Sequence, residues 1–408
     1  MENVEGIYQK NNPLAQPIKI NGLQIKNRLV KSATQENMVD KKGIITQDYI
    51  DYYNVLSAGG VGLIITGHFY VNIHGRNNIG MAGADLDEQI PKLRQMTDIV
   101  HKNNTAIFAQ LNHAGLKAVP ENGIDKRVLA PSKSLWASAM TLEEIHETVE
   151  NFGQAAARIK KARFDGIEIH AAHSYLIGQF LSKRMNRRKD KYGGSLSNRQ
   201  RFCLEVYDSI RENVGKDFPV IIKLDSYSRS YASTPPLIKL ITPKEALDTA
   251  KKLEDAGIDA IEVSCGLNAT KGAMPYKLSI TSSLRANGQN KTAYIAGFLL
   301  TPFDLVLNQT IWFQPHHNMK YIKLFKQKLN IPVLAGSCFR DPNYMKQVIK
   351  NQEADMICFA RPLVYNPNFP NEILEGSDKQ SGCINCNLCL FLLPSGKPLK
   401  CYFGKPPK

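Results

Sequence analysis

Runs of consecutive apolar and β-branched residues recur along the chain, and each run is followed by a segment whose apolar positions have helical spacing. Continuous rather than alternating apolar positions are typical of strands covered on both faces. Strands that alternate with helices pair in parallel through right-handed crossovers. Eight such units predict an α/β fold, a closed (β/α)8 TIM barrel. The eight runs are Arg28–Thr34, Gly60–Thr66, Thr105–Leu111, Asp165–His170, Pro219–Leu224, Ala260–Cys265, Ile331–Gly336 and Ala354–Ala360.

The segments between these runs carry helix start signals. Thr46 precedes one amphipathic segment, and Thr141 is followed three residues later by Glu144, which is a capping box. Thr242 precedes another helical segment and has Pro243 at the first helical position, where a missing N–H is tolerated. We therefore expect amphipathic helices that begin at these threonines.

One connection is longer than a barrel needs. After the sixth strand, roughly fifty residues with little periodicity form an insertion at about 267–316. An insertion at the C-terminal end of a barrel strand lies over the active-site face, so it is either a lid or substrate wall or a structural flap. We assign residues 1–370 to the barrel and residues 371–408 to a Cys-rich C-terminal extension.

Composition narrows the class of protein. The formal net charge is +15, but Lys and Arg are spread along the chain, which favours a solvated basic surface over a nucleic-acid site. Electrostatic attraction of an anionic coenzyme by this surface remains open. No apolar stretch reaches the roughly 20 residues of a membrane span, and the N-terminus lacks an export pattern. We expect a cytoplasmic protein, without a membrane or nucleic-acid partner; monomer and homo-oligomer remain open.

Polar residues stand at the C-terminal ends of the predicted strands, which meet at one mouth of a barrel. Gln110 offers a planar amide that both donates and accepts, as the edge of a heterocycle requires. Lys223 is a cation at the end of an apolar strand, where it needs an anionic partner or else reaches the rim. Small residues that expose backbone N–H groups follow the last two strands, and an arginine adds a fixed positive charge. Together they suit a phosphate group: Gly336, Ser337, Ala360 and Arg361.

Three ring side chains follow the fourth strand: His170, His173 and Tyr175. Metal binding would need a further ligand that this stretch lacks, and the imidazoles could also be satisfied structural groups. The interpretation we prefer is a pair of N–H donors for one ligand oxygen, with Tyr175 as a proton donor. Such a site fits reduction of an activated alkene.

Several separated motifs resemble the old yellow enzyme family of FMN-dependent ene-reductases, from about Leu14 to Pro370. They are "IKNRLVKSA", "AGGVGLIIT", "QLNHAG", "FDGIEIHAAHSYLIGQFLS", "NRRKDKYGGSLSNRQRFCLEV" and "ADMICFARPLVYNPNFP". The resemblance implies a TIM barrel that binds FMN, is reduced by NADH or NADPH, and passes hydride to an α,β-unsaturated carbonyl or similar small-molecule alkene.

The resemblance also implies roles for single residues. His170 and His173 would bind the substrate oxygen, Tyr175 would protonate the carbon opposite the hydride, and Lys223 would stand where the family usually has Arg. The flavin would contact the residues Ser32, Ala33, Thr34, Gly67 and Gln110, and its phosphate the residues Gly336, Ser337, Ala360 and Arg361. Ala360 replaces a usual Gly, which is compatible if its φ is negative.

The C-terminal extension contains a C-x2-C-x2-C-x11-C array formed by Cys383, Cys386, Cys389 and Cys401. It resembles the 4Fe-4S site of 2,4-dienoyl-CoA reductase, which has one more residue between the second and third Cys. A 4Fe-4S cluster, a zinc ion and reduced thiols are three alternatives. Besides an ene-reductase, the sequence thus allows a truncated iron–sulfur flavoenzyme fed by a partner protein, or a non-catalytic flavin-binding protein.

Overall fold

The structure is a computed structural model, and it describes residues 11–119, 127–135, 137–230, 238–265 and 316–404. The insertion expected at about 267–316 lies outside the described residues, except for His316 at its end. Within the described parts of the chain, no helix is long and apolar enough to cross a membrane.

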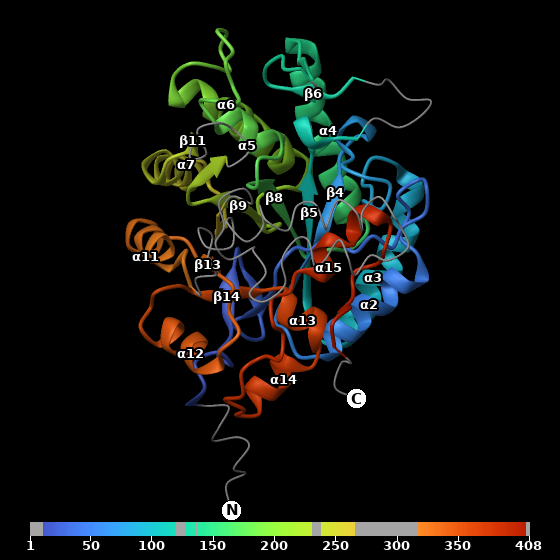
Figure 1. The fold of residues 1–408 in the computed structure, drawn as a ribbon, viewed down its shortest axis with the longest axis vertical. Helices are drawn as coiled ribbons and strands as arrows, with labels where there is room; N and C mark the ends of the chain where they lie inside the picture. Colours follow the sequence, from blue (N-terminus) through green and yellow to red (C-terminus); the bar gives the residue numbers. More distant parts are fainter. Residues whose placement is uncertain (1–10, 120–126, 136, 231–237, 266–315, 405–408) are drawn as a thin grey trace, which may run out of the picture.

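Eight parallel strands form a closed barrel, in which the last strand pairs with the first (Figure 1). Each lies within or overlaps one of the eight apolar runs, so the predicted (β/α)8 TIM barrel is confirmed. The barrel strands are β3 (Leu29–Lys31), β4 (Leu63–Tyr70), β5 (Ala106–Asn112), β8 (Gly166–Ala171), β9 (Val220–Asp225), β12 (Ala260–Ser264), β13 (Val333–Gly336) and β14 (Met356–Phe359).

The barrel strands are buried on both faces, as their continuous hydrophobicity predicts. One cluster of apolar side chains fills the barrel interior and includes Ile65, Phe108 and Ile221. A larger cluster lies between the strands and the surrounding helices and includes Phe152 and Phe202. At roughly 1.5 to 3 kcal/mol for each fully buried large apolar side chain, these two layers are the main source of folding free energy.

Helices surround the strands in Figure 1. They are α2 (Gln47–Ala58), α3 (Ile90–Lys102), α4 (Leu142–Lys161), α5 (Leu176–Leu181), α6 (Leu196–Val214), α7 (Pro243–Ala256), α11 (Met319–Lys328), α12 (Pro342–Lys350), α13 (Arg361–Tyr365), α14 (Phe369–Leu374) and α15 (Leu388–Phe391). The capping box at Thr141 is confirmed, and the helix start at Thr242 is confirmed as well, where Glu245 completes a second capping box. Thr46 does precede α2, but its hydroxyl donates to the Met38 carbonyl oxygen instead of accepting from a helix N–H.

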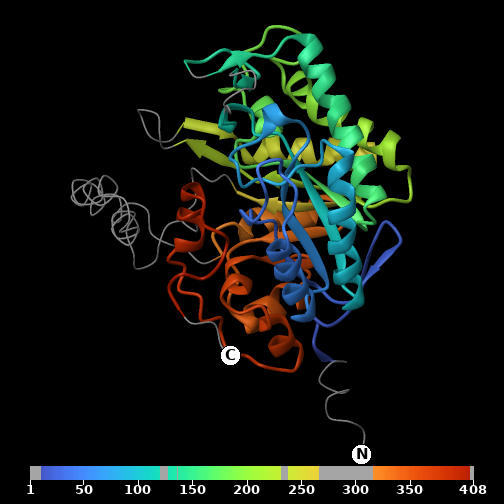
Figure 2. The same cartoon turned by 90° about the vertical axis from the view of Figure 1, so that its right-hand side faces the viewer.

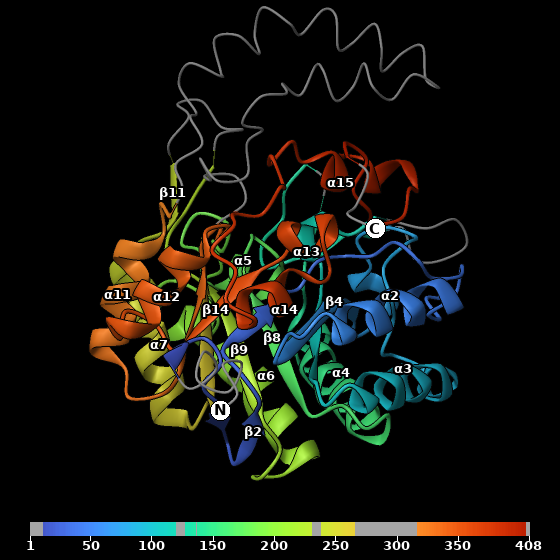
Figure 3. The same cartoon turned by 90° about the horizontal axis from the view of Figure 1, so that it is seen from below.

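Within the described residues, three strand pairs lie outside the barrel, and the sequence prediction did not include them. The hairpin of β1 (Ile18–Ile20) and β2 (Leu23–Ile25) packs its Ile20 and Ile25 against the barrel-interior cluster. The other pairs are β6 (Leu129–Ala130) with β7 (Ser138–Ala139), and β10 (Ser228–Ser230) with β11 (Ile238–Ile241). Figures 2 and 3 show β10 and β11 at the same end of the barrel as α15.

The C-terminal extension folds back onto the segment that follows β3. The Leu399 N–H donates to the Glu36 carbonyl oxygen at 2.8 Å, and the Asn37 side chain donates to the Lys397 carbonyl oxygen at 2.9 Å. These two hydrogen bonds bring the Cys-rich tail to the mouth where the barrel strands end.

Candidate active site

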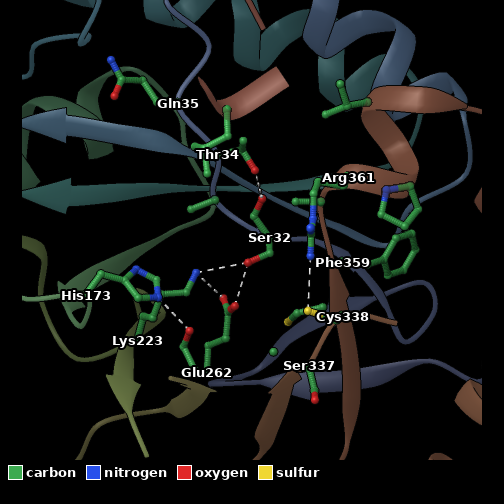
Figure 4. Close-up of a pocket in the computed structure, with 18 of the residues that line it drawn as sticks. Ser32, Thr34, Gln35, His173, Lys223, Glu262, Ser337, Cys338, Phe359 and Arg361 are labelled. Carbon is green, nitrogen blue, oxygen red and sulfur yellow. Dashed lines mark hydrogen bonds and ion pairs between the residues drawn. The ribbon is translucent and has the colours of Figure 1, made fainter. Parts of the chain in front are cut away.

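A cavity of about 330 Å³ lies at the C-terminal ends of the barrel strands. It is lined by almost all of the predicted barrel site residues: Ser32, Ala33, Thr34, Gln110, His170, His173, Tyr175, Lys223, Gly336, Ser337, Ala360 and Arg361. Figure 4 shows His173 and Lys223 across this space from Arg361. The structure therefore brings these residues together at one mouth of the barrel, and their roles stay predictions.

Gly67 is the exception among the predicted residues. It does not line the cavity, and its N–H donates to Glu36 Oε1 at 2.8 Å and to the Tyr53 hydroxyl at 3.0 Å. A Cβ at this position would collide with the Glu36 carboxylate. Gly67 thus allows this carboxylate to approach the backbone of β4, which is a structural role.

The end of β8 and the turn that leads to α5 bring three rings together. The ring centroids of His170 and His173 are 5.1 Å apart, and those of His170 and Tyr175 are 4.8 Å apart. Burial, followed by nearby cationic or ring groups, lowers the pKa of both imidazoles well below the ordinary value, so both rings are neutral at pH 7. Burial raises the pKa of Tyr175 to about 12, so its hydroxyl keeps its proton. Neutral imidazoles and a protonated phenol are able to donate hydrogen bonds to a ligand oxygen.

His68 on β4 is a fourth ring at this position, and the sequence reasoning missed it. It lines the cavity, and its ring centroid lies 5.2 Å from that of Tyr175. Burial lowers the pKa of His68 to about 3. Asn77 donates to the Tyr175 hydroxyl at 3.4 Å and to Gln35 Oε1 at 3.1 Å, and it lies 3.3 Å from His68 Nε2. The available signal was a His two residues after the apolar run Gly60–Thr66, near the C-terminal end of β4.

Lys223 is buried between two carboxylates. Its Nζ lies 2.9 Å from Glu262 Oε2 and 3.4 Å from Glu168 Oε2, and it donates to Ser32 Oγ at 3.2 Å (Figure 4). Burial alone would lower the pKa of Lys223, but the two carboxylates raise it above its ordinary value. The anionic partner that the sequence demanded is therefore supplied by the protein itself.

The same carboxylates reach the neighbouring polar groups. Ser32 Oγ donates to Glu262 Oε1 at 2.7 Å, and Gln110 Nε2 donates to Glu168 Oε2 at 2.5 Å. Burial raises the pKa of Glu168 well above its ordinary value, although Lys223 opposes this shift. The cluster can therefore hold a proton on Glu168 and present a cation and an amide side by side.

The predicted phosphate end lies where β13 and β14 finish. Ser337 Oγ is buried, lines the cavity and has no hydrogen-bond partner within the described parts of the chain. The φ of Ala360 is −126°, so this position does not require glycine. Arg361 donates to Asn387 Oδ1 at 2.7 Å and to Cys338 Sγ at 3.3 Å (Figure 4). The cavity thus has an orphaned hydroxyl and a guanidinium in its lining, and both groups are chemically suited to an anionic ligand.

The four cysteines of the tail line a second, smaller cavity of about 30 Å³. Cys389 and Arg361 line both cavities, so the two spaces share a wall. Burial raises the pKa of Cys383, and raises that of Cys389 to about 12. In the described residue ranges, no group of three or more His, Cys, Asp or Glu side chains lies close enough to hold a metal ion. The metal site at Cys383, Cys386, Cys389 and Cys401 stays a prediction.

Residues 13–236 match the NADH:flavin oxidoreductase / NADH oxidase family. The chain is 32% identical over 378 residues to the NADH oxidase of Thermoanaerobacter brockii, covering 91% of this chain and 52% of that protein. It is 31% identical over 396 residues to the cinnamate reductase of Clostridium sporogenes, covering 91% and 54%. This chain thus spans about half the length of these two relatives.

Other similar proteins match along most of their length. The NADPH dehydrogenase of Clostridium acetobutylicum is 30% identical over 356 residues, which cover 86% of this chain and 91% of that protein. The old yellow enzyme homologue from Zymomonas mobilis superimposes with a TM-score of 0.68 at 21% identity, covering 90% of this chain and 94% of that structure. A complex of 2-naphthoyl-CoA reductase gives a TM-score of 0.80 at 24% identity, covering 97% and 57%. The two structures share the fold of this chain.

Proposed function

The chain belongs to the NADH:flavin oxidoreductase / NADH oxidase family, and from that premise we propose that it is an FMN-dependent reductase of activated alkenes that uses NADH or NADPH. The name of a relative, cinnamate reductase, is consistent with an alkene conjugated to an oxygen-bearing group. The observation that carries the proposal is the convergence of two neutral imidazoles and a protonated phenol on the cavity that Lys223 also lines.

The cavity fits FMN in its polar groups. Ser337 Oγ is an orphaned buried hydroxyl, which a phosphate oxygen would satisfy, and Arg361 supplies a positive charge at the same end. Gln110 and Lys223 would hold the pyrimidine edge of the ring system, because an amide and a cation complement its alternating polar atoms. When bound, FMN supplies a hydride carrier between the nicotinamide coenzyme and the alkene.

The protein's own residues then divide the remaining work. His170 and His173 donate N–H groups to the substrate oxygen and stabilise the negative charge that develops there. Tyr175 keeps its proton at pH 7, since its pKa is about 12. Its hydroxyl gives this proton to one carbon of the C=C bond, while the other carbon receives the hydride. Asn77 holds the Tyr175 hydroxyl from the side at 3.4 Å.

The test uses purified protein supplied with FMN under nitrogen. We expect NADPH or NADH to bleach the yellow colour and 2-cyclohexenone to restore it. The matched control replaces both His170 and His173 by Leu and should still bleach, while its recolouring slows at least about a hundredfold, because two donors to a developing charge are lost. Protein that stays colourless with FMN, or wild type that recolours no faster than the control, overturns the proposal.

A second candidate function is favoured by the four tail cysteines, which all line one small cavity. In the described residues they lie too far apart to hold a metal ion, so a 4Fe-4S cluster or a zinc ion would have to draw the four thiols together. The wall shared at Cys389 and Arg361 would then bring electrons from a partner protein to the main cavity. Anaerobic purification followed by iron, sulfide and zinc analysis tests it, with Cys386→Ser as the control. Equal metal content in wild type and control excludes this site.

A further inference from the structure

His173 is held from three directions by side chains of three other barrel units. The backbone N–H of His173 donates to Asp225 Oδ2 at 2.9 Å, and Lys117 donates to the His173 carbonyl oxygen at 2.6 Å. Ser264 Oγ lies 2.8 Å from the ring nitrogen Nε2. Asp225 ends β9, Ser264 ends β12, and Lys117 follows β5.

The turn requires such support because of its backbone conformation. His173 has a φ of 58° and Ser174 has a φ of 56°, which is the left-handed region that residues with a side chain usually avoid. Two consecutive residues of this kind persist only where the surroundings hold them. The hydrogen bonds of Asp225 and Lys117 fix the turn and so aim the His173 ring into the cavity.

Asp225 has a second oxygen that faces the same ring. Its Oδ1 is buried, makes no hydrogen bond within the described residues, and lies 3.9 Å from His173 Nε2. The pKa of Asp225 is raised to about 7, because burial outweighs the opposing effects of the His173 backbone N–H and of the cations Lys117 and Lys223. Cys265, which follows β12, also interacts electrostatically with this carboxyl, but its thiol stays protonated because burial raises its pKa. Asp225 therefore changes charge near neutral pH beside a neutral imidazole.

The charge of Asp225 bears on which nitrogen of His173 carries the proton. Because Ser264 occupies Nε2, Nδ1 is the ring nitrogen that remains for a ligand. In a neutral ring, Nδ1 donates a hydrogen bond only if it carries the proton. Nε2 then carries none and accepts a hydrogen bond from the Ser264 hydroxyl. An ionised Oδ1 at 3.9 Å attracts a proton to Nε2 and favours the other tautomer, whereas a neutral carboxyl does not.

We propose that Asp225 and Ser264 are positioning residues that set the tautomer of His173, so that His173 donates to the substrate oxygen through Nδ1 while Asp225 is neutral and loses this donor when Asp225 ionises. This inference rests on the proposed function, because it needs a ligand oxygen at His173. It adds a pH-dependent control of substrate binding from a residue that does not itself touch substrate.

The kinetic test compares the KM for 2-cyclohexenone between pH 6 and pH 9 in the FMN-bound enzyme. We expect the wild-type KM to rise about fivefold, the effect of one neutral hydrogen bond. Asp225→Asn keeps an acceptor for the His173 N–H and cannot ionise, so its KM should stay at the low-pH wild-type value throughout. Ser264→Ala should have the high-pH value already at pH 6. Asp225→Asn that keeps the wild-type pH dependence overturns the proposal.

A second measurement reads the tautomer without any turnover. In FMN-supplied protein labelled with 15N-histidine, the His173 signals are identified by their loss in His173→Gln. We expect the proton to move from Nδ1 to Nε2 as the pH rises from 6 to 9 in wild type but not in Asp225→Asn. A wild-type tautomer that does not change overturns this inference. A tautomer change without alkene reduction retains the control by Asp225 and rejects the proposed function.

Discussion

Replacement of Lys223 by Met tests how the barrel interior tolerates charge. The Lys223 side chain is 3% exposed and lies between Glu168 and Glu262, which are 0% and 1% exposed. Met has a similar length but no charge, so the variant leaves two carboxylates buried side by side. Removing one member of a buried ion pair costs about 3 to 5 kcal/mol, against a total stability of about 5 to 15 kcal/mol. We expect a loss of about 4 kcal/mol at pH 8.

The loss should depend on pH with a definite sign. Without Lys223, a buried carboxyl takes up a proton on folding, so its pKa in the folded state is raised above that in the unfolded state. Stability is then highest below the unfolded pKa and is lost as pH rises through the folded pKa. The difference between Lys223→Met and wild type should therefore shrink from pH 8 to pH 5.

Urea unfolding of the protein without added FMN, at both pH values, measures this difference. The double variant Lys223→Met with Glu262→Gln is the control and should recover at least half of the loss at pH 8, because one buried charge has been removed. A loss below about 1 kcal/mol at pH 8, or a loss that is equal at pH 5 and pH 8, would refute the reasoning.

Three further changes have defined outcomes. Tyr175→Phe should slow recolouring of the reduced flavin by 2-cyclohexenone about a hundredfold but leave its bleaching by NADPH unchanged in stopped-flow traces; equal losses in both steps contradict the proton role. Asp225→Asn should gain roughly 2 to 3 kcal/mol of unfolding free energy relative to wild type between pH 5 and pH 8. The reason is that a carboxyl whose pKa is raised on folding, from 3.8 to about 7, makes the wild-type protein less stable as the pH rises over that range. A pH-independent difference in urea midpoints would exclude this. Gly193→Ala should cost about 1 to 3 kcal/mol in thermal unfolding, because a Cβ there would collide with the Arg188 carbonyl oxygen. Gly194 has open space around its Cβ position but a φ of 81°, so Gly194→Ser measures the cost of backbone strain without a collision.

Local signals in the sequence were sufficient for the barrel and for most of its mouth. Continuous apolar runs identified the strands, because parallel strands are buried on both faces, and the capping boxes at Thr141 and Thr242 marked helix starts. The C-terminal ends of parallel strands meet at one edge, so His170 and Arg361 could be placed in one cavity although they lie far apart in the chain. A further signal was present and unused: the Asn21–Gly22 pair between β1 and β2 is typical of a tight hairpin turn.

Pairing between strands decided what the sequence left open. Lys31, Glu168, Lys223 and Glu262 each interrupt an apolar run, but only the strand register sets Glu262 opposite Lys223 and Lys223 opposite His170. The sequence showed that Lys223 needed an anion and could not say that the protein supplies it.

The same limit applies to Gly67 and Asp225. Gly67 stands at the expected height in β4 but faces the Glu36 carboxylate rather than the cavity. Asp225 carries no motif, and its contact with His173 joins residues 52 positions apart in the chain. The sequence by itself determined the barrel and the kinds of side chain at its mouth, because these follow from periodicity and strand direction. The tertiary structure alone decided which charges meet, which groups lose their water and which protons they therefore hold.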